Sequence, residues 1–197
     1  MDFSLSEEQT LLQDSVEKYV RDNCNVERHR QLNAAKQGFD KNVWQQFAEL
    51  GWLSVPFSEV QGGFGGGAVD VMVICETLGK ALVREPILST VVTGGSFLRH
   101  GGNKEQQGKY IPAIIDGSSQ WAFAFAEKSS GYDMAAIETT AEHGDGFILT
   151  GEKIAVLNGE QADHLIVSAK TTNGVRVFIV DADSVGVSRD GFSTIDG

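Results

Sequence analysis

The chain has 197 residues, 41% hydrophobic and 22% charged, a composition that excludes a collagen, a coiled coil and a wholly disordered protein. Its 16 Lys and Arg against 27 Asp and Glu give a net charge of -11, which disfavours nucleic acid and anionic membranes as partners. Two cysteines without metal-ligand spacing, and a start that is neither basic nor apolar, predict a cytoplasmic protein without metal site, signal peptide or membrane span.

The first predicted helix covers residues 6–23. Ser6 is followed three residues later by Gln9, which is a capping-box pattern, and apolar residues including Val16 and Val20 recur on one face. The charged stretch after this helix shows no clear periodicity. We therefore assign it no regular structure.

A second helix is predicted between Asp40, placed as its N-cap, and Gly51, placed to end it. Further helices are predicted over residues 68–83 and 86–100. A last helix runs from Asn103 as N-cap to residues 116–117. The second helix has four apolar residues on the face that we expect to be buried: Val43, Trp44, Phe47 and Leu50.

Six residues, 62–67, include five glycines. Glycine-rich loops can bring backbone N–H groups close to phosphate. However, no Lys-Ser or Lys-Thr follows the loop of residues 62–67, and no predicted strand precedes it. We therefore prefer a linker between helices, with phosphate binding as the alternative.

From Gln120 onward the apolar period becomes two, which is typical of strands. Trp121, Phe123 and Phe125 alternate with alanines in a first strand. Two hairpins are predicted after it, with strands over residues 137–142 and 147–153, and over residues 164–170 and 175–180.

These elements predict an α+β protein with an α-helical domain over residues 1–118 and an antiparallel β domain over residues 119–197. Five or six strands are few for a closed barrel or sandwich. We therefore expect an incomplete, truncated β domain with exposed strand edges, in a fragment of a longer product.

The most specific candidate for a binding site is the segment of residues 121–133. A strand there runs directly into a polar turn of small residues, so its last N–H groups are available to a ligand. The alternative is a hairpin corner in which the Asp133 carboxylate satisfies nearby backbone N–H groups. The histidines, serines and carboxylates match no catalytic motif, so we assign no catalytic residue.

Six segments that span the chain carry motifs in a recognisable order: residues 1–20, 44–66, 74–82, 98–117, 124–142 and 148–171. In this order of motifs the chain resembles the acyl-CoA dehydrogenase family of flavoproteins. The resemblance implies an N-terminal helical domain, a middle β domain that holds FAD, and an acyl-CoA thioester that lies against the flavin. It also implies α,β-dehydrogenation, an oxidoreductase reaction of fatty acid metabolism in which a base removes the α proton and the β hydride passes to the flavin.

The resemblance places the cofactor contacts on two segments. Phe123, Phe125 and Ala126 belong to the first, and Ala155 and Leu157 to the second. The family usually has threonine at the position of Ala126, and tryptophan and threonine at those of Ala155 and Leu157. The aromatic side chain and two hydroxyls are therefore missing here, which is expected to weaken flavin binding.

Tyr132 matches a family serine that meets the CoA portion of the substrate, so it is the predicted substrate contact. Family members are about twice as long, and their C-terminal helical domain, absent here, carries the catalytic base. Glu127 matches a structural glutamate of the family and not that base. We therefore expect this chain to be inactive when alone.

Two hypotheses follow. In the first, the chain is part of an FAD-dependent acyl-CoA dehydrogenase that forms a homo- or hetero-oligomer, either a tetramer or a dimer. In the second, it is a flavin-poor, non-catalytic subunit that completes a two-subunit dehydrogenase. The latter resembles the small subunits of such enzymes in its missing flavin contacts.

Overall fold

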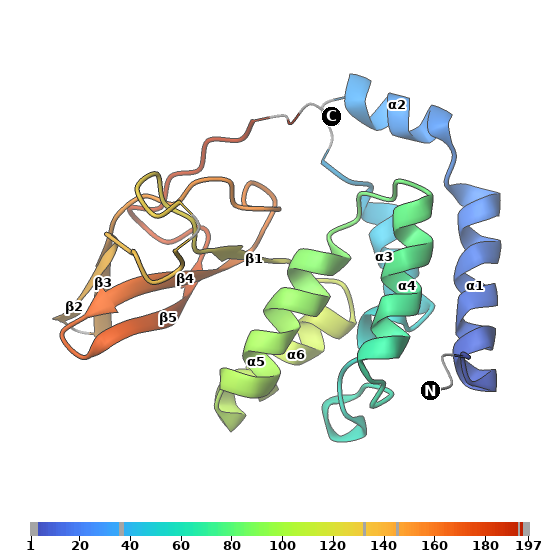
Figure 1. The fold of residues 1–197 in the computed structure, drawn as a ribbon, viewed down its shortest axis with the longest axis horizontal. Coiled ribbons are helices and arrows are strands. Elements are labelled where there is room, and N and C mark those ends of the chain that lie inside the picture. The colour runs from blue at the N-terminus through green and yellow to red at the C-terminus, as the bar shows by residue number, and fades with distance from the viewer. Residues whose placement is uncertain (1–3, 36–37, 132, 145, 193, 195–197) are drawn as a thin grey trace. The chain divides into compact units, whose positions relative to one another are not determined.

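A computed structural model describes residues 4–35, 38–131, 133–144, 146–192 and 194. The chain divides into two compact units, one that ends at Ser118 and one that begins at Ser119. The first contains the helices and the second a five-stranded sheet (Figure 1). The predicted α+β class, with helices before strands, is confirmed. In the described ranges, no helix is long and apolar enough to cross a membrane.

Helix α1 (Glu7–Asn23) begins as predicted, because Ser6 and Gln9 form the reciprocal hydrogen bonds of a capping box. Helix α3 (Lys41–Glu49) begins after Asp40, whose side chain accepts from a backbone N–H in its first turn. Leu50, expected on the buried face, is instead 46% exposed because α3 has ended before it. Tyr19 joins the two helices through edge-on contact with Phe47.

Helix α2 (Val26–Ala34) lies in the charged stretch that sequence periodicity left unassigned. Only one of its apolar side chains, Leu32, is buried. Its Arg28 side chain forms an ion pair with Glu85, a fully buried side chain from a distant part of the chain. An ion pair of this kind leaves no apolar period in the sequence, so the helix was missed.

The remaining helices follow the predictions with two corrections. Helix α4 (Ala68–Lys80) ends before residue 83, because Leu82 has a left-handed backbone with φ 55°. The helix predicted over residues 86–100 consists of a π-helix, η3 (Leu88–Gly94), followed by α5 (Gly95–Gly101). Two short 3-10 helices and a capped last helix complete the unit: η1 (Trp52–Ser54), η2 (Glu59–Gln61) and α6 (Lys104–Ile115), the last with Asn103 as N-cap.

The glycine-rich loop connects η2 to α4. The N–H groups of Gly63, Gly65 and Gly66 donate to carbonyls of residues 55–58 over 2.7–2.9 Å. A Cβ on Gly63 would lie 2.2 Å from the Phe57 carbonyl oxygen. These N–H groups are therefore not available to a phosphate, and the linker interpretation is confirmed.

The sheet of the second unit is mixed and not purely antiparallel. Strands β2 (Thr140–Gly144) and β3 (Gly146–Thr150) form one hairpin, and β4 (His164–Thr171) and β5 (Gly174–Asp181) form the other. However, β1 (Trp121–Ala124) pairs with β4 in parallel, and β2 meets β4 in parallel at a single residue pair. Parallel pairing needs a long crossover, and the chain between β1 and β4 supplies one.

The first hairpin is displaced from its predicted position. Residues 137–139 precede β2 because the N–H groups of Glu138 and Thr139 bond to the Glu127 carboxylate and not to a strand. Strand β3 ends at Thr150. Ala122 of β1 and Leu165 of β4 form a small core with Ala162 and Ala182, which lie outside the strands. Val175 and Val177 of β5 are exposed.

Breaking the Arg28–Glu85 pair should destabilise the helical unit. Arg28→Met leaves a buried carboxylate without its cation, so we expect a loss of about 3 to 5 kcal/mol in the free energy of unfolding. Urea titration followed by far-UV circular dichroism measures it. Arg30→Met, which removes an exposed pair with Glu27 on the same helix, should change stability by less than about 1 kcal/mol. Equal effects would contradict the structural role of Arg28.

Adding a methyl group at Gly63 should also destabilise the unit. The side chain would collide with backbone atoms that cannot turn away, so Gly63→Ala should cost about 1 to 3 kcal/mol. Gly79→Ala is the matched control, since Gly79 lies in α4 with open space around it and should gain up to about 1 kcal/mol. Thermal unfolding of both variants would show opposite shifts, and a Gly63→Ala protein as stable as the wild type would refute the close packing.

Candidate functional site

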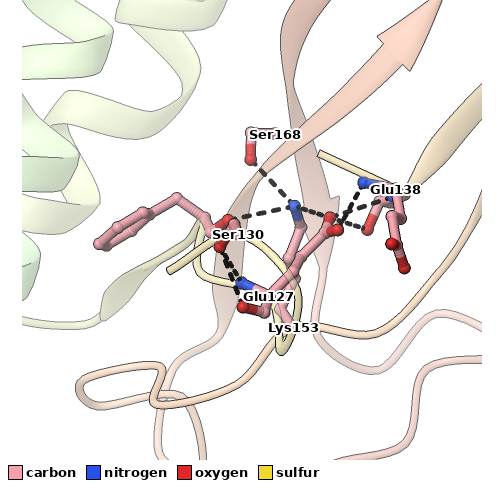
Figure 2. Close-up of polar contacts among 7 residues, drawn as sticks. Glu127, Ser130, Glu138, Lys153 and Ser168 are labelled. Atoms are coloured by element: carbon pink, nitrogen blue, oxygen red, sulfur yellow. Dashed lines mark hydrogen bonds and ion pairs between the residues drawn. The ribbon is translucent and has the colours of Figure 1, made fainter. Parts of the chain in front are cut away.

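A buried ion pair between Glu127 and Lys153 joins the two segments that sequence analysis selected. Lys153 Nζ lies 2.6 Å from Glu127 Oε1 and 3.0 Å from Ser168 Oγ on β4 (Figure 2). The Glu127 and Lys153 side chains are only 4% and 8% exposed. The pair therefore fixes both segments to the central strand of the sheet.

The Glu127 carboxylate accepts hydrogen bonds from several further groups. They include the Thr139 hydroxyl at 2.6 Å, the Thr139 N–H at 3.0 Å and the Glu138 N–H. Burial raises the pKa of the carboxyl group, but the Lys153 ammonium and these donors favour the charged form more strongly and lower the pKa to about 2. The group is thus held ionised, which suits a structural role and not that of a catalytic base.

The two segments lie side by side next to this pair. Lys153 Nζ also donates to the Phe125 carbonyl over 3.3 Å, and the Ile154 N–H donates to the Ala126 carbonyl over 2.9 Å. Ala155 and Leu157 follow Ile154 in the chain. The structure therefore brings the end of the first predicted segment against the start of the second.

Both segments carry exposed apolar side chains, and those of the first segment are aromatic. Phe123 and Phe125 stack with ring centroids 4.9 Å apart and planes inclined by 26°. Phe125 is 37% exposed and Leu157 is 64% exposed. Among the described residues, no acceptor is paired with the Ala126 N–H. This arrangement suits a flat apolar group that also accepts one hydrogen bond, so the residues fit the ring system of a flavin.

The second segment has a strained backbone. Ala155 and Asn158 have φ values of 51° and 62°, in the left-handed region that non-glycine residues rarely adopt. Each such residue costs about 1 to 3 kcal/mol and persists only where surrounding contacts hold it. One such contact is the hydrogen bond from the Asn158 side chain to the Trp121 carbonyl, 3.4 Å long.

The turn after the first segment agrees in part with the hairpin-corner alternative, because the Asp133 carboxylate accepts from a nearby backbone N–H group. Ser130 Oγ accepts from the Glu127 N–H over 3.1 Å, whereas the Asp133 carboxylate accepts from the Ala135 N–H over 2.9 Å. Asp133 therefore stabilises the chain beyond the turn and not the end of the strand. Tyr132, the predicted substrate contact, lies outside the described residues.

Sequence reasoning missed Lys153 and Thr139, the residues that hold Glu127. Neither residue belongs to a motif, so the sequence carries no signal that would have identified them. In the described parts of the chain, no group of three or more His, Cys, Asp or Glu side chains could hold a metal ion.

Comparison with known proteins now identifies the family. Residues 6–118 match the model of the acyl-CoA dehydrogenase N-terminal domain, and residues 122–194 that of the acyl-CoA dehydrogenase middle domain. The chain therefore belongs to the acyl-CoA dehydrogenase family, and the resemblance found in the sequence is confirmed.

Individual relatives show the same correspondence. Acyl-CoA dehydrogenase FadE27 of Mycobacterium tuberculosis is 31% identical, over 98% of this chain and 51% of its own length. The crystal structure of the ChsE4-ChsE5 complex of the same species matches 98% of this chain and 52% of the solved one, with 29% identity and a TM-score of 0.90. The structure of PigA with FAD and proline matches 94% of this chain and 51% of the solved one, with 27% identity and a TM-score of 0.83. The chain thus spans about half the length of these proteins.

The pKa of Glu127 predicts how stability depends on pH. Because folding lowers that pKa from its ordinary value of 4.5 to about 2, the stabilisation is complete above pH 4.5 and is lost as the pH falls towards 2. Glu127→Gln should flatten this part of the curve and lower the free energy of unfolding by about 3 to 5 kcal/mol at neutral pH. Urea titrations between pH 2 and 7 measure both effects.

Glu152→Gln is the control for this experiment. Glu152 is an exposed carboxylate one residue from Lys153, so its removal should leave the acid loss of stability in place. A Glu127→Gln protein with the same pH dependence as the wild type would contradict the assignment of the low pKa to Glu127.

Proposed function

We propose that this chain forms the N-terminal and middle domains, residues 1–118 and 119–197, of an FAD-dependent acyl-CoA dehydrogenase. The observation that carries the proposal is the alignment of the Phe125–Ala126 and Ala155–Leu157 segments by the Glu127–Lys153 pair, in a chain of this family. The match to PigA with bound FAD supports FAD as the cofactor.

In this proposal each segment has a separate task. The rings of Phe123 and Phe125 and the side chain of Leu157 provide the apolar surface for the flavin, and the Ala126 N–H donates to it. Ala155 also faces the flavin in this proposal, but it has no aromatic ring to stack on it. Tyr132 contacts the CoA portion of the acyl-CoA substrate. When bound, FAD accepts the β hydride of the acyl group, while the base that removes the α proton is not among the residues assigned here.

A specific observation favours a second function, that of a flavin-poor partner subunit. Ala126, Ala155 and Leu157 carry neither hydroxyl nor ring, and loss of two hydroxyl contacts and one stacked ring weakens a site by about 0.5 to 1.5 kcal/mol each. The ChsE4-ChsE5 complex contains two different subunits, which supports a hetero-oligomer as the setting for such a chain. We expect a protein with either function to be cytoplasmic.

Flavin content distinguishes the two functions. The full-length protein that contains these two domains would be purified alone and with any homologue encoded beside it, and its flavin measured by visible absorbance and by extraction. Stoichiometric FAD in the protein purified alone supports the dehydrogenase. FAD only in the mixed complex supports the partner subunit, and no flavin in either preparation contradicts both.

Restoring the missing groups should strengthen flavin binding. The triple variant Ala126→Thr, Ala155→Trp, Leu157→Thr regains two hydroxyls and a ring, so we expect its FAD Kd to fall by roughly ten- to a thousandfold. Titration of apoprotein with FAD measures this. Val175→Thr, an exposed replacement on β5, is the control and should leave the Kd unchanged. An unchanged Kd in the triple variant would show that these substitutions do not limit binding.

A further inference from the structure

Arg189 fastens the last part of the second unit to the turn that follows the candidate cofactor segment. Its Nη1 atom lies within hydrogen-bonding distance of three backbone carbonyl oxygens, at 3.2 Å for Gly159, 3.0 Å for Glu160 and 2.8 Å for Ala162. In the part of the chain that the structure describes, no other donor is paired with these carbonyls. The side chain is 28% exposed, so the contacts are partly shielded from water.

The turn that Arg189 holds continues directly from the strained segment. The Gln161 and Ala162 N–H groups both donate to the Asn158 carbonyl, over 3.2 Å and 3.0 Å, so the left-handed Asn158 and the turn form one hydrogen-bonded unit. A change in the turn is therefore transmitted to Asn158 and to Leu157 before it.

Apolar packing joins the same two parts of the chain. Val156, in the candidate cofactor segment, and Val187, two residues before Arg189, both pack against the cluster that contains Ala162 and Ala182. Arg189 thus adds hydrogen bonds between two parts of the chain that apolar side chains already hold together. Its ion pair with Asp183 is 3.7 Å long and the Asp183 side chain is fully exposed, so that pair contributes little.

The chemistry of the contact favours arginine. A guanidinium group carries its donors in a rigid plane and keeps its charge at every relevant pH, so one side chain can serve several carbonyls in a fixed geometry. A lysine ammonium has donors of the same charge on a flexible stem and would hold the same turn less tightly.

We propose that Arg189 is a positioning residue for flavin binding, which holds the 158–162 turn so that Ala155 and Leu157 face the cofactor. The inference rests on the proposed function of this chain and adds a residue from outside both cofactor segments. Arg189 itself is not placed against the cofactor. Its effect on binding passes through the backbone of the turn.

The first test compares FAD affinities. Arg189→Met should raise the Kd for FAD by about tenfold or more, and Arg189→Lys should recover part of the loss. Arg176→Met is the matched control, because Arg176 is an exposed arginine on β5 of the same unit. The midpoint of thermal unfolding is recorded for each variant. A Kd within twofold of the wild type in Arg189→Met, or an equal loss in Arg176→Met, would overturn the proposal.

The second test needs no flavin and separates this inference from the proposed function. Hydrogen exchange of the Gln161 and Ala162 N–H groups should be faster in Arg189→Met than in the wild type, while β4 keeps its protection. If the wild-type protein binds FAD neither alone nor in the mixed complex, the proposed function fails whatever the exchange rates are. Unchanged exchange in Arg189→Met would overturn the inference that Arg189 holds the turn, whether or not FAD binds. Faster exchange confined to the turn supports it.

Discussion

The buried carboxylate of Glu127 is the group on which the second unit depends. A charge in a nearly dry site must be paired and hydrogen-bonded, and here its partners come from residues 138–139 and from Lys153. Lys153 in turn donates to the Phe125 carbonyl and to Ser168 on the central strand. Four separate segments of the chain must therefore converge on one point before the charge is satisfied.

This convergence separates the geometry of the candidate site from its affinity. The Glu127–Lys153 pair sets the positions of the Ala126 and Ala155 backbones, whereas affinity for a flavin depends on the groups that those residues present. A chain can thus lose hydroxyl and ring contacts without losing the scaffold. The scaffold is therefore compatible with both proposed functions, a dehydrogenase with altered flavin contacts and a flavin-poor partner subunit.

Local features of the fold could be predicted from the sequence, and long-range ones could not. The capping box of α1 involves residues three apart, and its signal is complete within the motif. Helix α2 was missed because Arg28 meets its partner Glu85 from 57 residues away. The parallel pairing of β1 with β4 was missed for the same reason, since a strand pattern states which residues alternate but not which strand lies alongside.

The same distinction applies to the candidate site. The resemblance to a family selected both segments, and in the structure Phe125 and Leu157 are exposed apolar side chains within them. The contacts that hold the segments come from residues with no motif of their own, such as Lys153. Two left-handed residues lower the stability of the fold by about 2 to 6 kcal/mol together, while each hydrogen bond from a charged donor such as Lys153 contributes about 1.5 to 3 kcal/mol. Because these terms are of similar size, we expect the segment from Ala155 to Asn158 to open before the sheet does, and a ligand bound there to stabilise the whole unit.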